Sequence, residues 1–226
     1  MAKKGSGLRM VWCDVPADME EEFNRWYNEE HLADLLAVPG VLNAARYEAV
    51  KGGPKHLACY ELENAAVFDS EPCLEVRRNP SEWSRRVSPT VIGTAFIGNS
   101  YEMIHPSEVT PSIAGSGMAP ALQIGRISIP SEMEDEFNDW YNSIFVPGFE
   151  RVPGCIRGRR YRVIEGEPKY LTVYEFEHER VSQSAEWERE RNSSPLTQRI
   201  LPHLKLDPGT PGVWKKTFEL SKPGVS

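Results

Sequence analysis

The sequence lacks several features that would place it in a large class of proteins. Its 226 residues contain no apolar run near the roughly 20 residues that a membrane-spanning helix needs. The net charge is -7, which argues against nucleic acid or an anionic membrane as a partner. The basic start of the chain is followed by no hydrophobic segment of a signal peptide, so we expect a cytoplasmic protein.

Patterns that bind metals and cofactors are also missing. The four cysteines lie far apart and form no C-x-x-C pair, so we expect them to be small buried hydrophobic residues. The five histidines have no metal-ligand spacing. Neither the glycine-rich nucleotide-binding motifs nor the H-E-x-x-H and G-x-S-x-G motifs occur. The sequence therefore predicts no metal and no cofactor.

What the sequence does contain is one pattern written twice. The stretch EFNRWYNEEHLADLLAVPGVLNAARY begins at Glu22, and EFNDWYNSIFVPGFERVPGCIRGRRY begins at Glu136, 114 residues later. Residues 8–63 align with 122–177 without a gap, with 22 identities in 56 positions. Two copies are too few for a solenoid, and they indicate a duplicated unit that packs against its own image.

Each copy predicts the same order of elements. A strand is followed by an amphipathic helix that ends at Val-Pro-Gly, then by two strands, a polar helical region and a closing strand. The expected ranges are 8–15, 18–37, 41–50, 56–63, 66–88 and 90–104 in the first copy and 122–129, 131–151, 155–164, 170–177, 180–201 and 212–220 in the second.

This βαββαβ order is that of a ferredoxin-like unit, whose sheet has one face that its own helices leave bare. Two such units can cover each other's bare faces. We therefore predict an α+β fold in which two tandem ferredoxin-like repeats, 1–104 and 121–226, pack sheet to sheet as an intrachain dimeric α/β barrel. Residues 105–120, rich in Pro, Gly and Ser, would link them.

The pattern E-F-N-x-W-Y-x-x-x-H, then V-P-G and R-Y, then a G-x-P-K turn into Y-E resembles the dimeric α/β-barrel superfamily, in particular its EthD-like and uncharacterised members. The resemblance covers nearly the whole chain, twice. It implies a homodimer as the expected state. It implies little about function, because the superfamily includes cofactor-free monooxygenases, cyclases, isomerases, lyases, haem enzymes and plain binding modules.

Strand alternation predicts which residues of the first strand face the barrel interior. Val11, Cys13 and Val15 form a uniformly apolar side that should pack under the helices. The mixed side carries Trp12 and Asp14, and its counterpart in the second copy carries Arg126. We expect these three residues to line an interior cavity. For Arg126, a salt bridge within the protein is an equally good interpretation.

His31 is the strongest single candidate for catalysis. It follows Tyr27 by four residues on the expected buried stripe of the helix, and the second copy replaces it with Phe145 while keeping the packing aromatics. The resemblance adds that related proteins often carry a functional histidine at this helix position. Asp34, three residues further, could orient the ring or raise its pKa. We predict that His31 is a general acid or base, although a structural histidine is the commoner case.

Other non-repeated or clustered polar positions complete the predicted site. Asn43 and Tyr47 share one strand face, Arg159 lies on the corresponding face of the second copy, and His56 has Tyr170 as its counterpart. We predict that they contribute to substrate binding, together with Trp12, Asp14 and Tyr27. Salt bridges are the alternative for the arginines, and a packing role is the alternative for the repeated tyrosines.

These residues favour a cofactor-independent enzyme of the lyase, isomerase or cyclase type, acting on a small aromatic or apolar substrate in the barrel cavity. The catalytic residues would be His31, Asp34 and Arg126, and such a role would suit the catabolism of aromatic compounds. Two alternatives stay open: a monooxygenase, cofactor-free or haem-dependent, and a non-enzymatic protein that binds small ligands.

Overall fold

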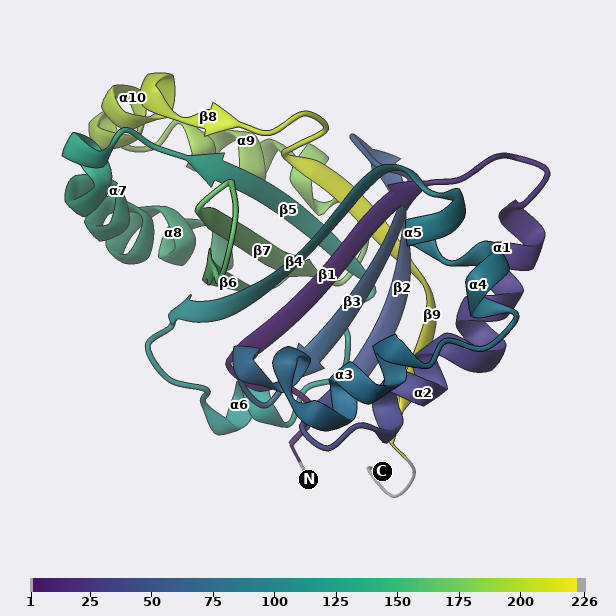
Figure 1. Ribbon diagram of the computed structural model, residues 1–226. Coiled ribbons are helices and arrows are strands. Elements are labelled where there is room, and N and C mark those ends of the chain that lie inside the picture. Colours follow the sequence, from purple (N-terminus) through teal and green to yellow (C-terminus); the bar gives the residue numbers. More distant parts are fainter. Residues whose placement is uncertain (1, 223–226) are drawn as a thin grey trace.

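The computed structural model describes residues 2–222, and its first part contains five helices and four strands around one sheet (Figure 1). These elements are β1 (Gly7–Asp14), α1 (Glu20–Trp26), α2 (Leu32–Ala37), β2 (Val41–Lys51), β3 (His56–Leu62), α3 (Glu71–Arg78), α4 (Ser84–Val87), α5 (Pro89–Ile92) and β4 (Thr94–His105). The predicted helical region 66–88 is broken because Pro80 disfavours a helical conformation at Asn79, where α3 stops.

The second part repeats this order after the short helix α6 (Pro111–Ala114). Its elements are β5 (Ala121–Ser128), α7 (Glu134–Trp140), α8 (Val146–Glu150), β6 (Cys155–Val163), β7 (Tyr170–Phe176), α9 (Ala185–Arg191), α10 (Pro195–Ile200), β8 (Lys205–Leu206) and β9 (Gly212–Ser221). No helix within residues 2–222 is both long enough and apolar enough to cross a bilayer.

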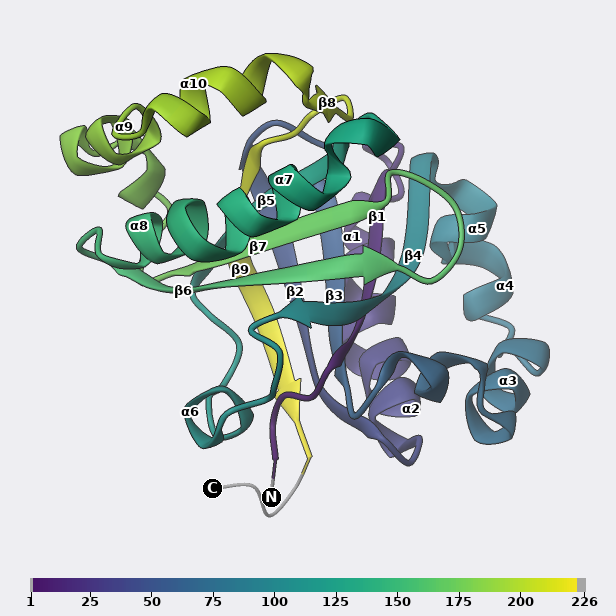
Figure 2. The ribbon, with the colours of Figure 1, turned by 90° about the vertical axis from the view of Figure 1, so that its left-hand side faces the viewer.

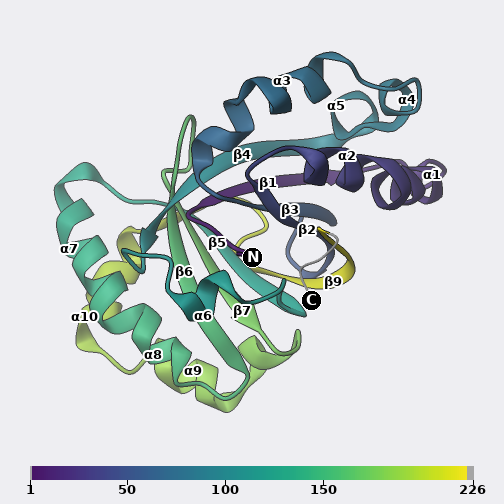
Figure 3. The same cartoon turned by 90° about the horizontal axis from the view of Figure 1, so that it is seen from below.

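Eight of the strands close into an antiparallel barrel. Their order is β7-β6-β4-β1-β3-β2-β9-β5, and β5 pairs back onto β7, while the two-residue β8 pairs only with β5. The two parts are joined by the pairs β4–β6 and β2–β9, so each closing strand lies beside the other part's second strand (Figure 2). Figure 3 shows α1–α5 outside one side of the barrel and α7–α10 outside another.

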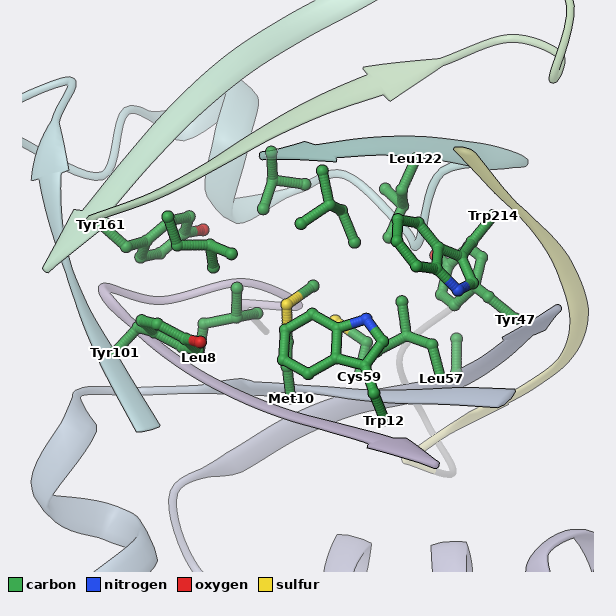
Figure 4. Close-up of a cluster of buried hydrophobic side chains, with 14 of the residues drawn as sticks. Leu8, Met10, Trp12, Tyr47, Leu57, Cys59, Tyr101, Leu122, Tyr161 and Trp214 are labelled. Atoms are coloured by element: carbon green, nitrogen blue, oxygen red, sulfur yellow. The ribbon is translucent and has the colours of Figure 1, made fainter. Parts of the chain in front are cut away.

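Strand alternation places the side chains of β1 as the sequence predicts. Met10 and Trp12 point into the barrel, where they join a buried cluster with Tyr47 and Trp214 (Figure 4). Val11 and Cys13 point outward and pack against the helix residues of the first part. The barrel interior is therefore one hydrophobic core, shared by strands from both parts of the chain.

This core also corrects the expectation of a substrate cavity inside the barrel. Aromatic and aliphatic side chains from opposite walls meet across the interior (Figure 4), and the hollow left beside them is about 10 Å³. A space of that size is about that of one water molecule. An eight-stranded barrel is narrow enough for its own side chains to fill it.

One short irregularity recurs in both copies of the first helix. Tyr27–His31 between α1 and α2, and Tyr141–Phe145 between α7 and α8, form π-helical turns. In the first of them the N–H of Leu32 donates to the carbonyl of Tyr27, five residues back. The wider turn brings residues five apart onto one face, and π-turns of this kind are frequent at functional sites.

Candidate functional site

A cavity of about 720 Å³ lies outside the barrel, between the outer face of the first part's sheet and its helices. This volume is in the range of ordinary small-molecule sites. The floor comes from β1 and β3, one wall from α1 and α2, and the other from α3 to α5 with the loops around them. The lining residues that matter below are Arg9, Tyr27, His31, Asp34, Leu35, Tyr60, Phe68, Arg77, Arg85, Val91 and Phe96.

His31 is positioned in this cavity by the π-helical turn. Its ring stacks on Trp26, five residues earlier, with centroids 4.4 Å apart and an angle of 21° between the planes. The edge of the ring meets Tyr27 at a centroid distance of 5.2 Å. The side chain is half-buried, and its imidazole forms no hydrogen bond with any residue in 2–222. The imidazole thus packs on aromatic rings and lines the cavity.

Burial decides the charge of His31. Desolvation lowers the pKa of His31 to about 4, although the nearby Glu30 carboxylate acts in the opposite direction. The imidazole is therefore neutral at neutral pH, which leaves it able to accept a proton and unable to donate one from an imidazolium. Of the two predicted roles, general acid and general base, this environment suits the base.

The wall behind His31 is fixed by a hydrogen-bond network. The Trp26 indole N–H donates to Glu30 Oε1 at 3.1 Å and to Ser84 Oγ at 3.0 Å. Ser81 and Ser84 both donate to the same oxygen of Glu30, so this carboxylate ties the π-helical turn to the segment around α4. The network holds the indole on which the imidazole stacks.

Asp34 lies at the cavity's edge and is exposed. Partial burial raises its pKa, and the charge of Glu30 raises it further. No hydrogen bond joins Asp34 to His31 among the described side chains, and Asp34 has no share in the shift of the histidine pKa. No hydrogen bond among residues 2–222 therefore supports the predicted orienting role of Asp34.

Aromatic side chains gather at the corresponding place in the second part of the chain. Phe145, which replaces His31, packs on Trp140 and on Phe149 with centroids 4.4 and 4.7 Å away. Phe149 then packs on Trp187 at 4.0 Å, and both are buried. Phe149 is the counterpart of Leu35, which lies 114 residues earlier in the chain. Leu35 lines the first cavity and does not fill it. The position that lines a cavity at His31 is therefore packed among aromatic rings at Phe145.

The charged groups that line the cavity are mostly cationic. Arg9, Arg77 and Arg85 line it, against one carboxylate, that of Asp34, in a chain whose net charge is -7. The sequence did not predict Arg9 as a site residue, because Arg9 lies on the outward face of β1, where strand alternation predicts residues that pack under the helices. Its counterpart Gln123 carries no charge, so the comparison of the two copies contains a signal that could have found it.

Three of the ten predicted site residues, Tyr27, His31 and Asp34, line this cavity, and the other seven do not. Trp12 lies inside the barrel core, and Arg126 stacks over its ring at 5.2 Å while pairing with Asp207 at 3.3 Å. Asp14, at the end of β1, accepts a hydrogen bond from the Lys55 backbone N–H at 2.7 Å.

The four remaining residues are held by internal contacts. Asn43 is buried and donates to Glu219, and the Tyr47 hydroxyl donates to the carbonyl of Ala119. Arg159 is buried and forms a two-fold hydrogen bond with Glu61, at 2.5 and 3.1 Å. For Arg159 the structure therefore shows the salt-bridge alternative, with the guanidinium bound to carboxylates of the protein itself.

His56 belongs to the one group within 2–222 whose side chains lie close enough to share a metal ion, with Glu20 and Glu48. Its Nδ1 lies 3.5 Å from an Arg46 nitrogen, which can only donate, so the ring hydrogen is on Nε2, 3.6 Å from Glu20. Lys55 also pairs with Glu20. A metal would need the Nε2 lone pair and would face two cations, so these contacts fit an ion-pair cluster.

No protein-family model matches the sequence, and no curated protein matches it. Solved structures do match. An anthrone oxidase-like protein aligns with a TM-score of 0.63 and 13% identity over 100% of this chain and 98% of its own. A proposed monooxygenase from Lactobacillus acidophilus gives 0.59 and 9% over 95% of each chain. Chlorite dismutase from Candidatus Nitrospira defluvii gives 0.58 and 9% over 94% of this chain and 91% of its own.

Identities this low concern the fold alone. The anthrone oxidase-like, monooxygenase-like and chlorite dismutase-like structures belong to one superfamily, that of the dimeric α+β barrels. The mixed α+β fold with a closed eight-stranded antiparallel barrel is what this chain shares with them. The chain has the fold of the dimeric α+β barrel superfamily.

Proposed function

We propose that the chain is an enzyme in which His31 removes a proton from an acidic carbon or hydroxyl of a small aromatic or apolar substrate, without a bound cofactor. The observation that carries this proposal is the imidazole of His31, stacked on Trp26 at the wall of a cavity of about 720 Å³, at a position where the second copy packs Phe145 among aromatic rings. The lyase, isomerase and cyclase reactions favoured by the sequence share this first step.

The step is a transfer of one proton. The C–H or O–H bond of the substrate breaks, its electron pair stays on the substrate as an enolate- or phenolate-like anion, and the proton binds to the imidazole of His31. Tyr27, Tyr60 and Phe68 offer ring faces and edges to an apolar substrate. The lining arginines favour the anion that forms. The imidazolium then returns the proton at another atom in an isomerisation or a cyclisation.

Haem, which some members of the superfamily bind, does not fit these residues. A histidine that ligates a metal almost always donates its second ring N–H to a carboxylate or a carbonyl, which fixes the ring and raises its basicity. Among residues 2–222 His31 has no such partner, and its ring lies flat on Trp26. A haem-dependent oxygenase is therefore not the reaction that we propose.

A second candidate is a cofactor-free oxygenase, and the structural likeness to an anthrone oxidase-like protein and to a proposed monooxygenase favours it. The same proton transfer would give an anion that passes electrons to O₂. For an anthrone the balance is one anthrone and one O₂ giving one anthraquinone and one water. We expect O₂ consumption equal to anthraquinone formation if this candidate holds. If the protein catalyses exchange of the anthrone methylene hydrogens but takes up no O₂, the oxygenase candidate is excluded and only the proton-transfer reaction remains.

The pH dependence of that exchange tests the role of His31. The catalysed rate, measured anaerobically in D₂O by NMR, should stay constant from pH 8 to about 5 and fall below, with an apparent pKa of about 4. The sign follows from burial: the lowered pKa keeps the imidazole in its basic form until the pH falls through that value. With the ordinary pKa of a histidine the rate would already fall at about pH 6.5, and a fall there would contradict the proposed environment of His31.

We also infer that the barrel arose by tandem duplication of one ferredoxin-like unit, with 1–104 and 121–226 as the copies and 105–120 as the link between them. The sheet order β4-β1-β3-β2 and its equivalent β9-β5-β7-β6 support this origin, as do the two π-helical turns 114 residues apart. After duplication, one copy would have kept a site and the other would have closed it.

A further inference from the structure

Arg9 is the one charged lining residue that is half-buried rather than exposed, and it has no counter-charge among residues 2–222. Its guanidinium lies 4.0 Å from the centroid of the Phe68 ring, and one nitrogen donates to Ser100 Oγ at the long distance of 3.5 Å. Its Nε is buried and unpartnered, and no carboxylate within residues 2–222 forms an ion pair with it. A half-buried guanidinium with unused donors favours an anion that supplies the missing acceptors.

The residues around Arg9 also favour the binding of an anion there. Arg77 packs on the same ring, with 4.1 Å to the centroid of Phe68, so two cations share one aromatic side chain. Arg77 has its own acceptors, the Phe68 carbonyl at 3.0 Å and Asp69 at 3.4 Å. Burial and then the charge of Arg77 lower the pKa of Arg9 to about 10, which still leaves it charged at neutral pH. Asp34 is the only carboxylate among the lining residues, and it forms no ion pair with Arg9.

Gly98 on β4 makes room for this guanidinium. A Cβ built at Gly98 would lie 2.7 Å from an Arg9 terminal nitrogen, closer than side-chain carbons approach. The apolar residues of the cavity, with Val91 and Phe96 exposed at its edge, offer contacts for a ring system beside the charge. A guanidinium presents parallel N–H donors that match the two oxygens of a carboxylate.

We propose that the cavity takes an aromatic acid whose carboxylate binds Arg9, while its ring system lies among the aromatic side chains next to His31. The inference rests on the proposed function for the identity of the site, since it names the substrate class of the same cavity. It assigns Arg9 to ground-state binding and specificity, and it leaves the proton transfer to His31.

Binding of 1-naphthoate and of its neutral analogue 1-naphthamide, measured by calorimetry, tests this assignment. The wild-type chain should bind the carboxylate about ten- to a hundredfold more tightly than the amide. Arg9→Gln, which copies Gln123 of the second part, should weaken naphthoate to the level of naphthamide and leave naphthamide unchanged. Arg9→Lys, which keeps the charge and the bulk, should retain part of the preference and provides the test if Arg9→Gln does not fold.

Arg78→Gln is the matched control, because Arg78 lies on α3, is exposed, pairs with Glu71 and does not line the cavity. It should keep the full preference, which separates direct contact from net charge. Equal binding of the two probes by the wild type, no binding of either, or the same loss in Arg78→Gln would each overturn the proposal. His31→Gln should keep the preference for naphthoate. A wild-type chain that prefers the acid but catalyses no proton transfer would refute the proposed function and leave the assignment of Arg9 intact.

Discussion

Replacing His31 by glutamine is expected to lower the catalysed rate of proton removal by about 10²–10⁴-fold, the usual contribution of a general base. Glutamine keeps the polarity and the approximate volume of the side chain but cannot hold the transferred proton. The measurement is the exchange of anthrone methylene hydrogens in D₂O under argon, compared at equal protein concentration. Under argon the proton-transfer step is seen without any later reaction with O₂.

His31→Phe is a more specific test than His31→Gln, because the second part of the chain already has a phenylalanine, Phe145, at the equivalent position. Phe145 packs on Trp140 and Tyr141 in an equivalent π-helical turn, so the fold accepts phenylalanine after Trp-Tyr in this geometry. We expect a midpoint of thermal unfolding close to that of the wild type and no catalysis. A folded His31→Phe protein with full exchange activity would refute the role of His31. Ligand binding without any activity in the wild type would favour the alternative of a non-enzymatic binding protein.

The sequence predicted the barrel more fully than the site, and β1 shows why. Alternation along a strand depends only on chain geometry, so the assignment of Val11 outward and Trp12 inward was correct. Which of the two faces is hollow depends on how completely the opposing layers fill the space. The filling of that space depends on Tyr47 and Trp214 inside the barrel and on the helices outside it, so it cannot be predicted from the sequence of one strand.

The comparison of the two copies was the more useful guide. It identified His31, which lines the cavity, because packing residues had to recur and His31 did not. It also selected Asn43, His56 and Arg159, whose differences between the copies reflect internal hydrogen bonds and ion pairs. Non-recurrence marks any asymmetric contact, and only the three-dimensional structure separates a contact within the protein from an open side chain.

The largest effect on stability is expected at Arg159. Its guanidinium contacts Glu61 at 2.5 Å and Glu175 at 2.7 Å, two carboxylates that occupy the same position in the two copies. Lys4 is the other buried cation near them, 2.5 Å from Glu175 and 3.8 Å from Glu61. Closing the barrel from two copies of one sheet brings these like charges together, and Arg159, which has Ala45 as its counterpart, neutralises them.

Arg159→Met is therefore expected to lower the free energy of unfolding by about 3–5 kcal/mol, because it leaves buried carboxylate charge with too few partners. Urea denaturation followed by tryptophan fluorescence measures the loss, and Arg78→Gln, which removes an exposed arginine, should leave the midpoint nearly unchanged. A loss no larger than that of the control would contradict the neutralising role.

The pH dependence gives an independent check on this ion cluster. Lys4 and Arg159 hold the pKa of Glu175 at about 2, below its ordinary value of 4.5, even though burial acts in the opposite direction. A depressed carboxyl pKa contributes stability that is complete above the unfolded value and is lost as the pH falls from about 4.5 toward 2. Arg159→Met removes much of the cause of that shift. The difference in unfolding free energy between wild type and variant should therefore narrow through this window, and a difference that stays constant down to pH 2 would place the stabilisation elsewhere than in the charge of Glu175.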